Sequence, residues 1–436
     1  MTHTLSMPWG KTENLKIALP QDWQLDGELL PASLPGVENP AAETRRSLAA
    51  PVGLPRLSEL ARGKQRVALV IDDGSRPTPV RQILPAVLDE LCSGGVALSQ
   101  ISLVPALGVH RAMTEAEVGE RSGIPGLGGM QLVTHDCDSL DLARLGATSR
   151  GTPVLVNPAV ANADLVVSIG CIEPHIIASF GGGYKNLFPG VAGRATIAHN
   201  HALNCRPDTF NMVGQPIERN PMRLDLEEAG GMLKAPVFIV NAVLNSATQV
   251  VRVVSGHPVQ AHRAGTQVSA EIFGVKVAAP ADVVITDSHP MDSDLRQGVK
   301  ALANTVRAVR RGGVMITLVR ADEGVGVFGL ANKKLPLGRG ALKTLAPVLL
   351  PLVPRLKLNG LGEEDKFFLY FALQAMSHAT LLMYAPSLPA WIHERLPFVQ
   401  FVASPEEALQ RAAGLVGEKA KVLTFPFGGS TYPILK

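Results

Sequence analysis

The sequence has little cysteine and no long apolar segment. Its four cysteines, Cys92, Cys137, Cys171 and Cys205, are scattered without CxxC spacing, so neither a disulfide framework nor a zinc knuckle is indicated. No uninterrupted stretch of about 18 apolar residues occurs, and the first residues carry charges and prolines where a signal peptide needs an apolar core. We therefore expect a reduced, cytoplasmic protein without a membrane span.

An excess of charge of one sign is also absent. Lys and Arg total 41 against 38 Asp and Glu, a net charge of +3, which does not favour binding to nucleic acid or to a membrane surface. The content of 46% hydrophobic and 18% charged residues excludes general disorder, and 42 Gly with 33 Pro predict many tight turns. At about 150 residues per domain, the length of 436 residues predicts two or three domains.

Short apolar, β-branched runs recur along the chain between turn residues. We interpret them as buried parallel strands at 66–72, 101–106, 131–135, 152–157, 164–170, 236–244, 282–287 and 313–319. Helical patterns lie between several of them, as at Pro79–Leu91 and Gln297–Val309. Strand, crossover helix and strand in succession predict an α/β protein with largely parallel sheets.

A domain boundary is indicated near residues 265–280, where the run ADVVITD repeats the residue pattern of the earlier ADLVVSIG. We predict a first α/β domain over 1–270, a second over 275–408, and a return of 410–436 to the first domain. Ligands of open parallel sheets bind beyond the carboxyl ends of the strands. The active site is therefore expected in the cleft between the two domains.

The segment DDGSRPTPV, residues 72–80, is a strand end followed by a turn of small residues and a helix start. The amides of Gly74 and Ser75 suit a phosphate or carboxylate, and Arg76 offers a bidentate fork. An ordinary turn with a surface arginine is the alternative. Further along, His110 lies in a loop before Thr114 and Glu117, whose spacing predicts a capping box and a helix start at Thr114.

The densest segment runs from Gly170 to Leu203. Three glycines, Gly181–Gly183, allow close approach of a ligand to the backbone, and Lys185 follows them. This is no Walker loop, because Asn186 follows the lysine, and it is no GxGxxG motif.

Three histidines of this segment, His175, His199 and His201, offer imidazole ligands for nickel, zinc, copper or iron. On a helix, His199 and His201 would lie on different faces and would not bind one metal ion together. Metal ligation, phosphate binding and a structural turn all remain possible from the residues alone. Near 297–300, Gln297 and Lys300 share a helix face, which suits either an anion clamp or an ordinary solvated surface.

Together the segments DDGSRP, ALGVHR, EPHIIASFGGGYKNLFPG, HNH and QGVK stand in the order and approximate spacing of the nickel-pincer lactate racemase family. The sequence resembles a member of that family over nearly its whole length. The match is specific because five separated segments agree.

The resemblance implies a cofactor derived from nicotinic acid, the nickel-pincer nucleotide, attached to Lys185 by a thioamide. His201 matches the histidine that completes the nickel coordination. The residues that match the loop in contact with the cofactor are Asp73, Gly74, Ser75 and Arg76. The enzymes that build the cofactor are implied as partners.

The resemblance also implies the reaction, in which the family removes a hydride from a 2-hydroxy acid and returns it to either face of the planar keto acid. His110 and His175 match two acid/base histidines, and Gln297 and Lys300 match residues that hold the substrate. Arg76 or Lys300 would bind the substrate carboxylate by a charge-assisted hydrogen bond. A redox enzyme that releases the keto acid, and a protein that only binds nucleotide or metal, are the alternatives.

The sequence departs from the family pattern at several positions. Ser75 replaces threonine, Gly181 replaces serine, and Tyr184 precedes the tethering lysine. Arg296 stands beside Gln297, where an aromatic residue is expected in lactate racemases. The substrate is therefore expected to be a 2-hydroxy acid whose identity is open, with a larger or more anionic acid as one possibility.

Overall fold

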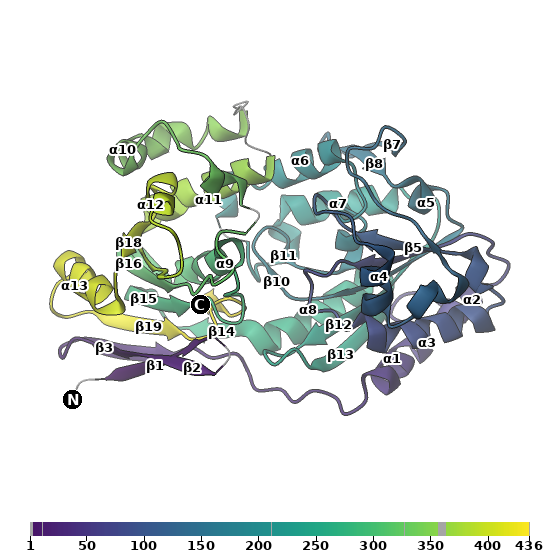
Figure 1. Cartoon of the computed structure of the whole chain (residues 1–436), viewed down its shortest axis with the longest axis horizontal. Coiled ribbons are helices and arrows are strands. Elements are labelled where there is room, and N and C mark those ends of the chain that lie inside the picture. The colour runs from purple at the N-terminus through teal and green to yellow at the C-terminus, as the bar shows by residue number, and fades with distance from the viewer. Residues whose placement is uncertain (1–2, 11, 211, 327, 356–362, 436) are drawn as a thin grey trace.

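The computed structural model describes residues 3–10, 12–210, 212–326, 328–355 and 363–435. Two six-stranded sheets lie at the centres of two α/β halves within this part of the chain (Figure 1). The predicted α/β class with largely parallel sheets is confirmed.

The first sheet has the order β13-β12-β9-β4-β5-β6. Its strands are β4 (Val67–Asp72), β5 (Ile101–Ala106), β6 (Gln131–Leu132), β9 (Leu165–Cys171), β12 (Val237–Leu244) and β13 (Val250–Gly256). Neighbouring strands are parallel except for β12 and β13. Every residue of β4, β9 and β12 is buried, which explains their continuous apolar runs, because helices cover both faces. The helices of this half are α1 (Pro40–Ala49), α2 (Leu57–Leu60), α3 (Val80–Ser93), α4 (Glu115–Ser122), α5 (Pro158–Ala161), α6 (Arg194–Ala202), α7 (Pro221–Gly231) and α8 (Gln260–Phe273).

The second sheet is parallel throughout and has the order β18-β17-β16-β15-β19-β3. Its strands are β3 (Gln24–Glu28), β15 (Ala281–Asp287), β16 (Val309–Leu318), β17 (Thr380–Tyr384), β18 (Gln400–Val402) and β19 (Lys421–Phe425). The helices of this half are α9 (Leu295–Thr305), α10 (Arg339–Leu349), α11 (Glu363–His378), α12 (Trp391–Arg395) and α13 (Pro405–Val416). Helix α11 packs against α6 and so joins the two halves (Figure 1).

Four strand pairs lie outside the large sheets. They are β1 (Thr4–Trp9) with β2 (Glu13–Ala18), β7 (Ala143–Ala147) with β8 (Pro153–Val156), β10 (Pro174–His175) with β11 (Ser179–Phe180), and β14 (Gly274–Val277) with β20 (Tyr432–Leu435). The strand expected at 152–157 is thus not part of a parallel sheet, because β8 pairs antiparallel with β7. The helix expected to reach Val309 ends at Thr305, since Val309 begins β16.

Strand pairing and packing locate both chain ends in the fold. Residues 410–436 were expected to return to the first half; β19 lies between β15 and β3 in the second sheet, whereas Tyr432 of β20 packs into one core with Ile172 and Phe180 of the first half. The beginning of the chain, which we placed in the first domain, supplies β3 and covers the second sheet beside β19 (Figure 1). The physical reason is apolar burial, because Leu5, Met7, Ile17 and Trp23 pack into one core with Val283 of β15.

Replacing Trp23 with alanine tests this placement. Because Trp23 is only 3% exposed and belongs to the core of the second sheet, we expect a loss of about 3–5 kcal/mol in the free energy of unfolding, measured with urea. Trp391→Ala is the matched control, since Trp391 is 47% exposed and should cost about 1 kcal/mol or less. Equal losses in the two variants would contradict the placement.

Candidate active site

Three loops that carry candidate residues meet at one edge of the first sheet. Strand β4 pairs with β5 on one side and β9 on the other, all in parallel. The segments that follow these strands carry Asp73, His110 and His175, respectively. Because parallel strands end at a common edge, residues distant in sequence are brought together beyond it.

Asp73 and His110 form a close pair. The distance from His110 Nδ1 to Asp73 Oδ2 is 2.5 Å, and the hydroxyl and amide of Ser75 donate to Asp73 Oδ1 at 2.6 and 3.1 Å. Burial opposes the charge of Asp73, but the hydrogen bonds from His110 and Ser75 outweigh it and lower the pKa of this carboxyl to about 2. An ionised carboxylate accepts from Nδ1–H, so the lone pair of neutral His110 lies on Nε2.

The loop after β4 differs in detail from the helix-end anion cradle considered from the sequence. The Ser75 amide is bonded to Asp73 within the loop, and α3 begins only at Val80. Gly74 is exposed, with open space where a side chain would lie. Arg76 donates from a guanidinium nitrogen to Glu173 Oε1 at 2.8 Å, which ties this loop to the segment after β9.

The glycine-rich segment forms a tight loop ahead of Lys185. Gly182 and Gly183 have φ values of +72° and +64°, and a Cβ on Gly182 would lie 2.6 Å from the Ile172 side chain. The Gly183 amide donates to Asn241 Oδ1 at 2.8 Å. Lys185 follows in a short 3-10 turn and is partly buried. These glycines are therefore required by the backbone and by close packing.

A buried arginine that the sequence analysis did not single out holds this loop. Arg223 of α7 is 0% exposed and donates to the carbonyls of Ala178 at 3.3 Å and Gly182 at 3.1 Å, and also to that of Phe180. His262 is buried as well, and its Nε2 lies 2.8 Å from the Gly181 carbonyl. In the sequence, Arg223 looks like an ordinary surface residue of an amphipathic helix, so no local signal indicates its role.

Helix α6 separates the two neighbouring histidines, as the helical spacing predicted. His201 is buried, and its Nδ1 lies 2.8 Å from the Ile197 carbonyl, so its neutral ring carries the proton there and offers a lone pair at Nε2. His199 Nδ1 instead lies 2.8 Å from the Thr152 hydroxyl. The two rings are therefore held by different partners on different faces of the helix.

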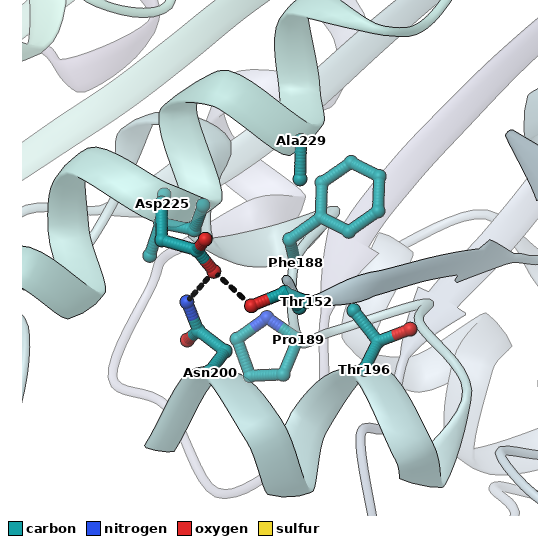
Figure 2. Close-up of a pocket in the computed structure, with 8 residues that line it drawn as sticks. Thr152, Phe188, Pro189, Thr196, Asn200, Asp225 and Ala229 are labelled. Atoms are coloured by element: carbon teal, nitrogen blue, oxygen red, sulfur yellow. Dashed lines mark hydrogen bonds between the residues drawn. The ribbon is translucent and has the colours of Figure 1, made fainter. Parts of the chain in front are cut away.

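His199 contacts a hydrogen-bond network around the buried carboxylate of Asp225. Asp225 borders a small cavity, where it bonds to Thr152 and Asn200 (Figure 2). Asp225 is 0% exposed and accepts from Thr148 Oγ1 at 2.6 Å, Thr152 Oγ1 at 2.7 Å and Asn200 Nδ2 at 2.8 Å. Because Thr152 donates its one hydroxyl proton to Asp225, it accepts from His199 Nδ1. His199 thus supports the hydrogen-bond network through which Asp225 holds α6.

The second half contributes α9, whose N-cap Asp294 accepts from the Gln297 amide at 2.8 Å. Gln297 and Lys300 are half-buried on this helix. Burial, with repulsion from Arg76 and Arg296, lowers the pKa of Lys300 to about 8, although Glu173 opposes the shift. Side chains from both halves therefore act on one another electrostatically.

Arg296, the position that departs from the family pattern, contacts an aromatic ring of the second half. Its guanidinium carbon lies 5.0 Å from the centroid of the Phe368 ring of α11. An arginine over a ring is held by the cation–π attraction.

Known proteins similar to this chain identify its family. A family model described as the lactate racemase N-terminal domain matches residues 10–211. A lactate racemase from Thermoanaerobacterium thermosaccharolyticum is 32% identical over 330 residues, which cover 74% of this chain and 76% of that protein. The chain belongs to the lactate racemase family. A lactate racemase from Lactiplantibacillus plantarum is 27% identical over 398 residues, 88% of each chain.

Solved structures place the whole chain in the lactate racemase fold. The lactate racemase apoprotein from T. thermosaccharolyticum matches with a TM-score of 0.85 and 26% identity over 100% of both chains. A protein from Thermotoga maritima, with a TM-score of 0.64 and 15% identity over 91% of this chain and 98% of that one, shares the fold alone. As a lactate racemase family member the protein is an isomerase, as the sequence predicted. Among the described residues, no helix is long and apolar enough to cross a membrane.

The side-chain amine of Lys185 has an unusually low pKa. Burial and the charges of Arg76 and Arg223 lower its pKa to about 7, against a smaller opposing effect of Glu173. An ordinary lysine amine stays protonated until about pH 10. Near neutral pH, Lys185 is therefore a nucleophile in a way that a surface lysine is not.

The Asp225 network can be tested in the apoprotein by Asp225→Asn. Three buried donors point at this carboxylate, so the NH₂ group of an asparagine would face donors instead of bonding to them. We expect a loss of about 3 kcal/mol in the free energy of unfolding, seen as a lower melting temperature. Asp208→Asn is the control, since that carboxylate is in an exposed ion pair and should change stability little. An unchanged melting temperature in Asp225→Asn would show that the network does not support the fold.

The lowered pKa of Lys185 predicts its labelling profile. The neutral amine is the reactive form, so brief acetylation of the apoprotein should reach half its maximum near pH 7 at this residue. Peptide mass spectrometry measures the extent, with exposed Lys343 as the reference in the same digest. An extent that keeps rising to about pH 10 at Lys185, as for an ordinary lysine, would contradict the shift.

Proposed function

We propose that this protein racemises or epimerises a 2-hydroxy acid with a nickel-pincer nucleotide attached to Lys185. The observation that supports this most is the set of groups gathered at the candidate site. They are the low-pKa lysine Lys185, the pair of Asp73 and His110, and one cation from each half of the molecule, Arg76 and Lys300. The activity named for the relatives, lactate racemase, supports the same class of reaction.

The residues present fit such a cofactor. A lysine amine with a pKa of about 7 is neutral in a large fraction of molecules near pH 7 and is suited to an amide-type bond with a carboxyl or thiocarboxyl group. His201 offers the Nε2 lone pair that a nickel ion would take, with the ring held through the Ile197 carbonyl. Asp73, Gly74 and Ser75 then lie in the loop proposed to contact the cofactor, beside Arg76.

Removing the α-proton of a 2-hydroxy acid is difficult because the adjacent carboxylate is already negative. When bound, the cofactor supplies a hydride acceptor, so C2 can become planar without a carbanion. The protein then has to hold the carboxylate and move the hydroxyl proton. We assign the carboxylate to Arg76 and Lys300, and the orientation of an oxygen to Gln297.

His110 has the arrangement of a general base, because Asp73 holds Nδ1–H and stabilises the imidazolium that forms. His175 matches the second acid/base histidine of the family, and its contacts are distinct from those of His110. Lactate is the first substrate to test. Larger or dianionic 2-hydroxy acids, such as malate, are the next substrates to test, because Arg296 adds a positive charge beside Gln297.

The proposal is tested on protein produced together with the enzymes that build the cofactor. We expect intact-mass and peptide analysis to place an adduct on Lys185, with about one nickel per chain, and conversion of single enantiomers of 2-hydroxy acids on a chiral column. Lys185→Ala should lose the adduct, whereas Lys300→Ala should keep it and bind substrate more weakly. No adduct and no nickel, beside a control racemase that acquires both, would overturn the proposal.

A further inference from the structure

A largely buried arginine of helix α4, Arg121, is bonded to the loop that follows β4. We infer that Arg121 is a positioning residue for the proposed reaction, because it holds the backbone of Arg76 where the side chain of Arg76 can bind the substrate carboxylate. The inference rests on the proposed function, in which Arg76 binds that carboxylate. Arg121 acts only through the loop and the strand end to which it is bonded.

The guanidinium of Arg121 donates to three acceptors in this loop. Its Nε donates to the Asp72 carbonyl at 2.6 Å, and its Nη2 donates to an Asp72 carboxylate oxygen and, at 3.3 Å, to the Arg76 carbonyl. The side chain of Arg121 is 12% exposed and that of Asp72 is 5% exposed. The two carbonyls stand on either side of residues 73–75, so one planar side chain spans the whole turn.

The carboxylate of Asp72 closes the same loop from its other end. Its second oxygen accepts from the hydroxyl of Thr78, two residues before α3 begins at Val80. Burial raises the pKa of the Asp72 carboxyl, and the guanidinium of Arg121 is the strongest influence that opposes this shift. Arg121 therefore favours the ionised carboxylate, which can accept from an arginine and a threonine at once.

Helix α4 also holds the segment that follows His110. Its first-turn residue Glu117 accepts from the Thr114 amide at 2.8 Å and from Arg111 at 2.9 Å. Arg121 lies four residues further along the same helix, about one turn away. The loop after β4 and the loop after β5 are therefore both attached to one short helix, which fixes them relative to each other.

The side chain of Arg76 is held at one end only without this helix. Its guanidinium donates to Glu173 at 2.8 Å, whereas the bond from Arg121 fixes the backbone from which the side chain starts. Among the charged groups around Lys185, Arg76 has the largest effect in lowering the pKa of the Lys185 amine. The reactivity of Lys185 therefore reports on where the guanidinium of Arg76 lies.

Arg121→Lys is the variant that separates positioning from charge. A lysine keeps a positive charge beside the buried Asp72, which preserves folding, but it lacks the planar fork that reaches all three acceptors. Arg81→Lys is the matched control. Arg81 of α3 is exposed and donates to the Glu120 carbonyl of α4 at 2.9 Å, so it joins the same helices without a bond to residues 72–76.

The first test measures the acetylation profile of Lys185 in the apoprotein. We expect the pH of half-maximal labelling to rise from near 7 by about half a pH unit or more in Arg121→Lys, because Arg76 is held less closely. Arg76→Gln removes the charge itself and should shift the profile at least as far, and Arg81→Lys should leave it unchanged. A wild-type profile in Arg121→Lys, beside a shifted one in Arg76→Gln, would overturn the inference.

The second test measures the steady-state kinetics of cofactor-loaded enzyme. We expect Arg121→Lys to raise KM for the 2-hydroxy acid by about tenfold and to change kcat by less than about threefold, because the carboxylate is bound in both the ground state and the transition state. The adduct on Lys185 should remain. A wild-type KM, or a loss in kcat alone, would show that Arg121 does not act through carboxylate binding and would overturn the inference.

The two tests separate this inference from the proposed function. A wild-type enzyme that carries the cofactor but interconverts no 2-hydroxy acid would overturn the proposed function. The acetylation profile needs neither cofactor nor substrate, so it decides in either case whether Arg121 holds Arg76 in place.

Discussion

The candidate site depends on the hydrogen bonds that the buried guanidinium of Arg223 donates to the glycine-rich loop. The loop from Ala178 to Gly183 turns back tightly inside the protein, so its carbonyls cannot reach water and need donors. Arg223 supplies these donors from α7, and His262 approaches the carbonyl of Gly181. A planar, always charged side chain with five N–H groups suits several carbonyls at once. The position of Lys185, only a few residues further on, follows from this arrangement.

A second constraint is the accumulation of positive charge where the two halves meet. Lys185 and Lys300 have pKa values lowered to about 7 and 8, which means that the folded protein holds their charged forms at a cost. Such a cost is typical of functional sites, because the same field attracts an anionic ligand. Glu173, bonded to Arg76, compensates part of the charge and leaves the rest for carboxylate or phosphate groups.

The sequence predicted most of the first sheet because its strands are buried on both faces and appear as continuous apolar runs. It did not predict that β3 and β19 pair in the second sheet, since the pairing of distant strands leaves no local pattern. The capping box at Thr114 was predicted and is confirmed, because it depends on residues only three apart. Arg223 and Asp225 were not found, since burial of a charged helix residue is decided by tertiary packing.

The difference between His110 and His175 shows the same limit within the site. The partner of His110 is Asp73, 37 residues earlier in the chain, and only the parallel pairing of β4 with β5 brings them together. His175 instead takes its tautomer from amides two and three residues later in its own turn. Because Asp73 has a pKa of about 2, it remains ionised over the whole range in which an imidazole titrates. The tertiary fold therefore supplies His110 with a permanent anion, whereas the local backbone supplies the partners of His175.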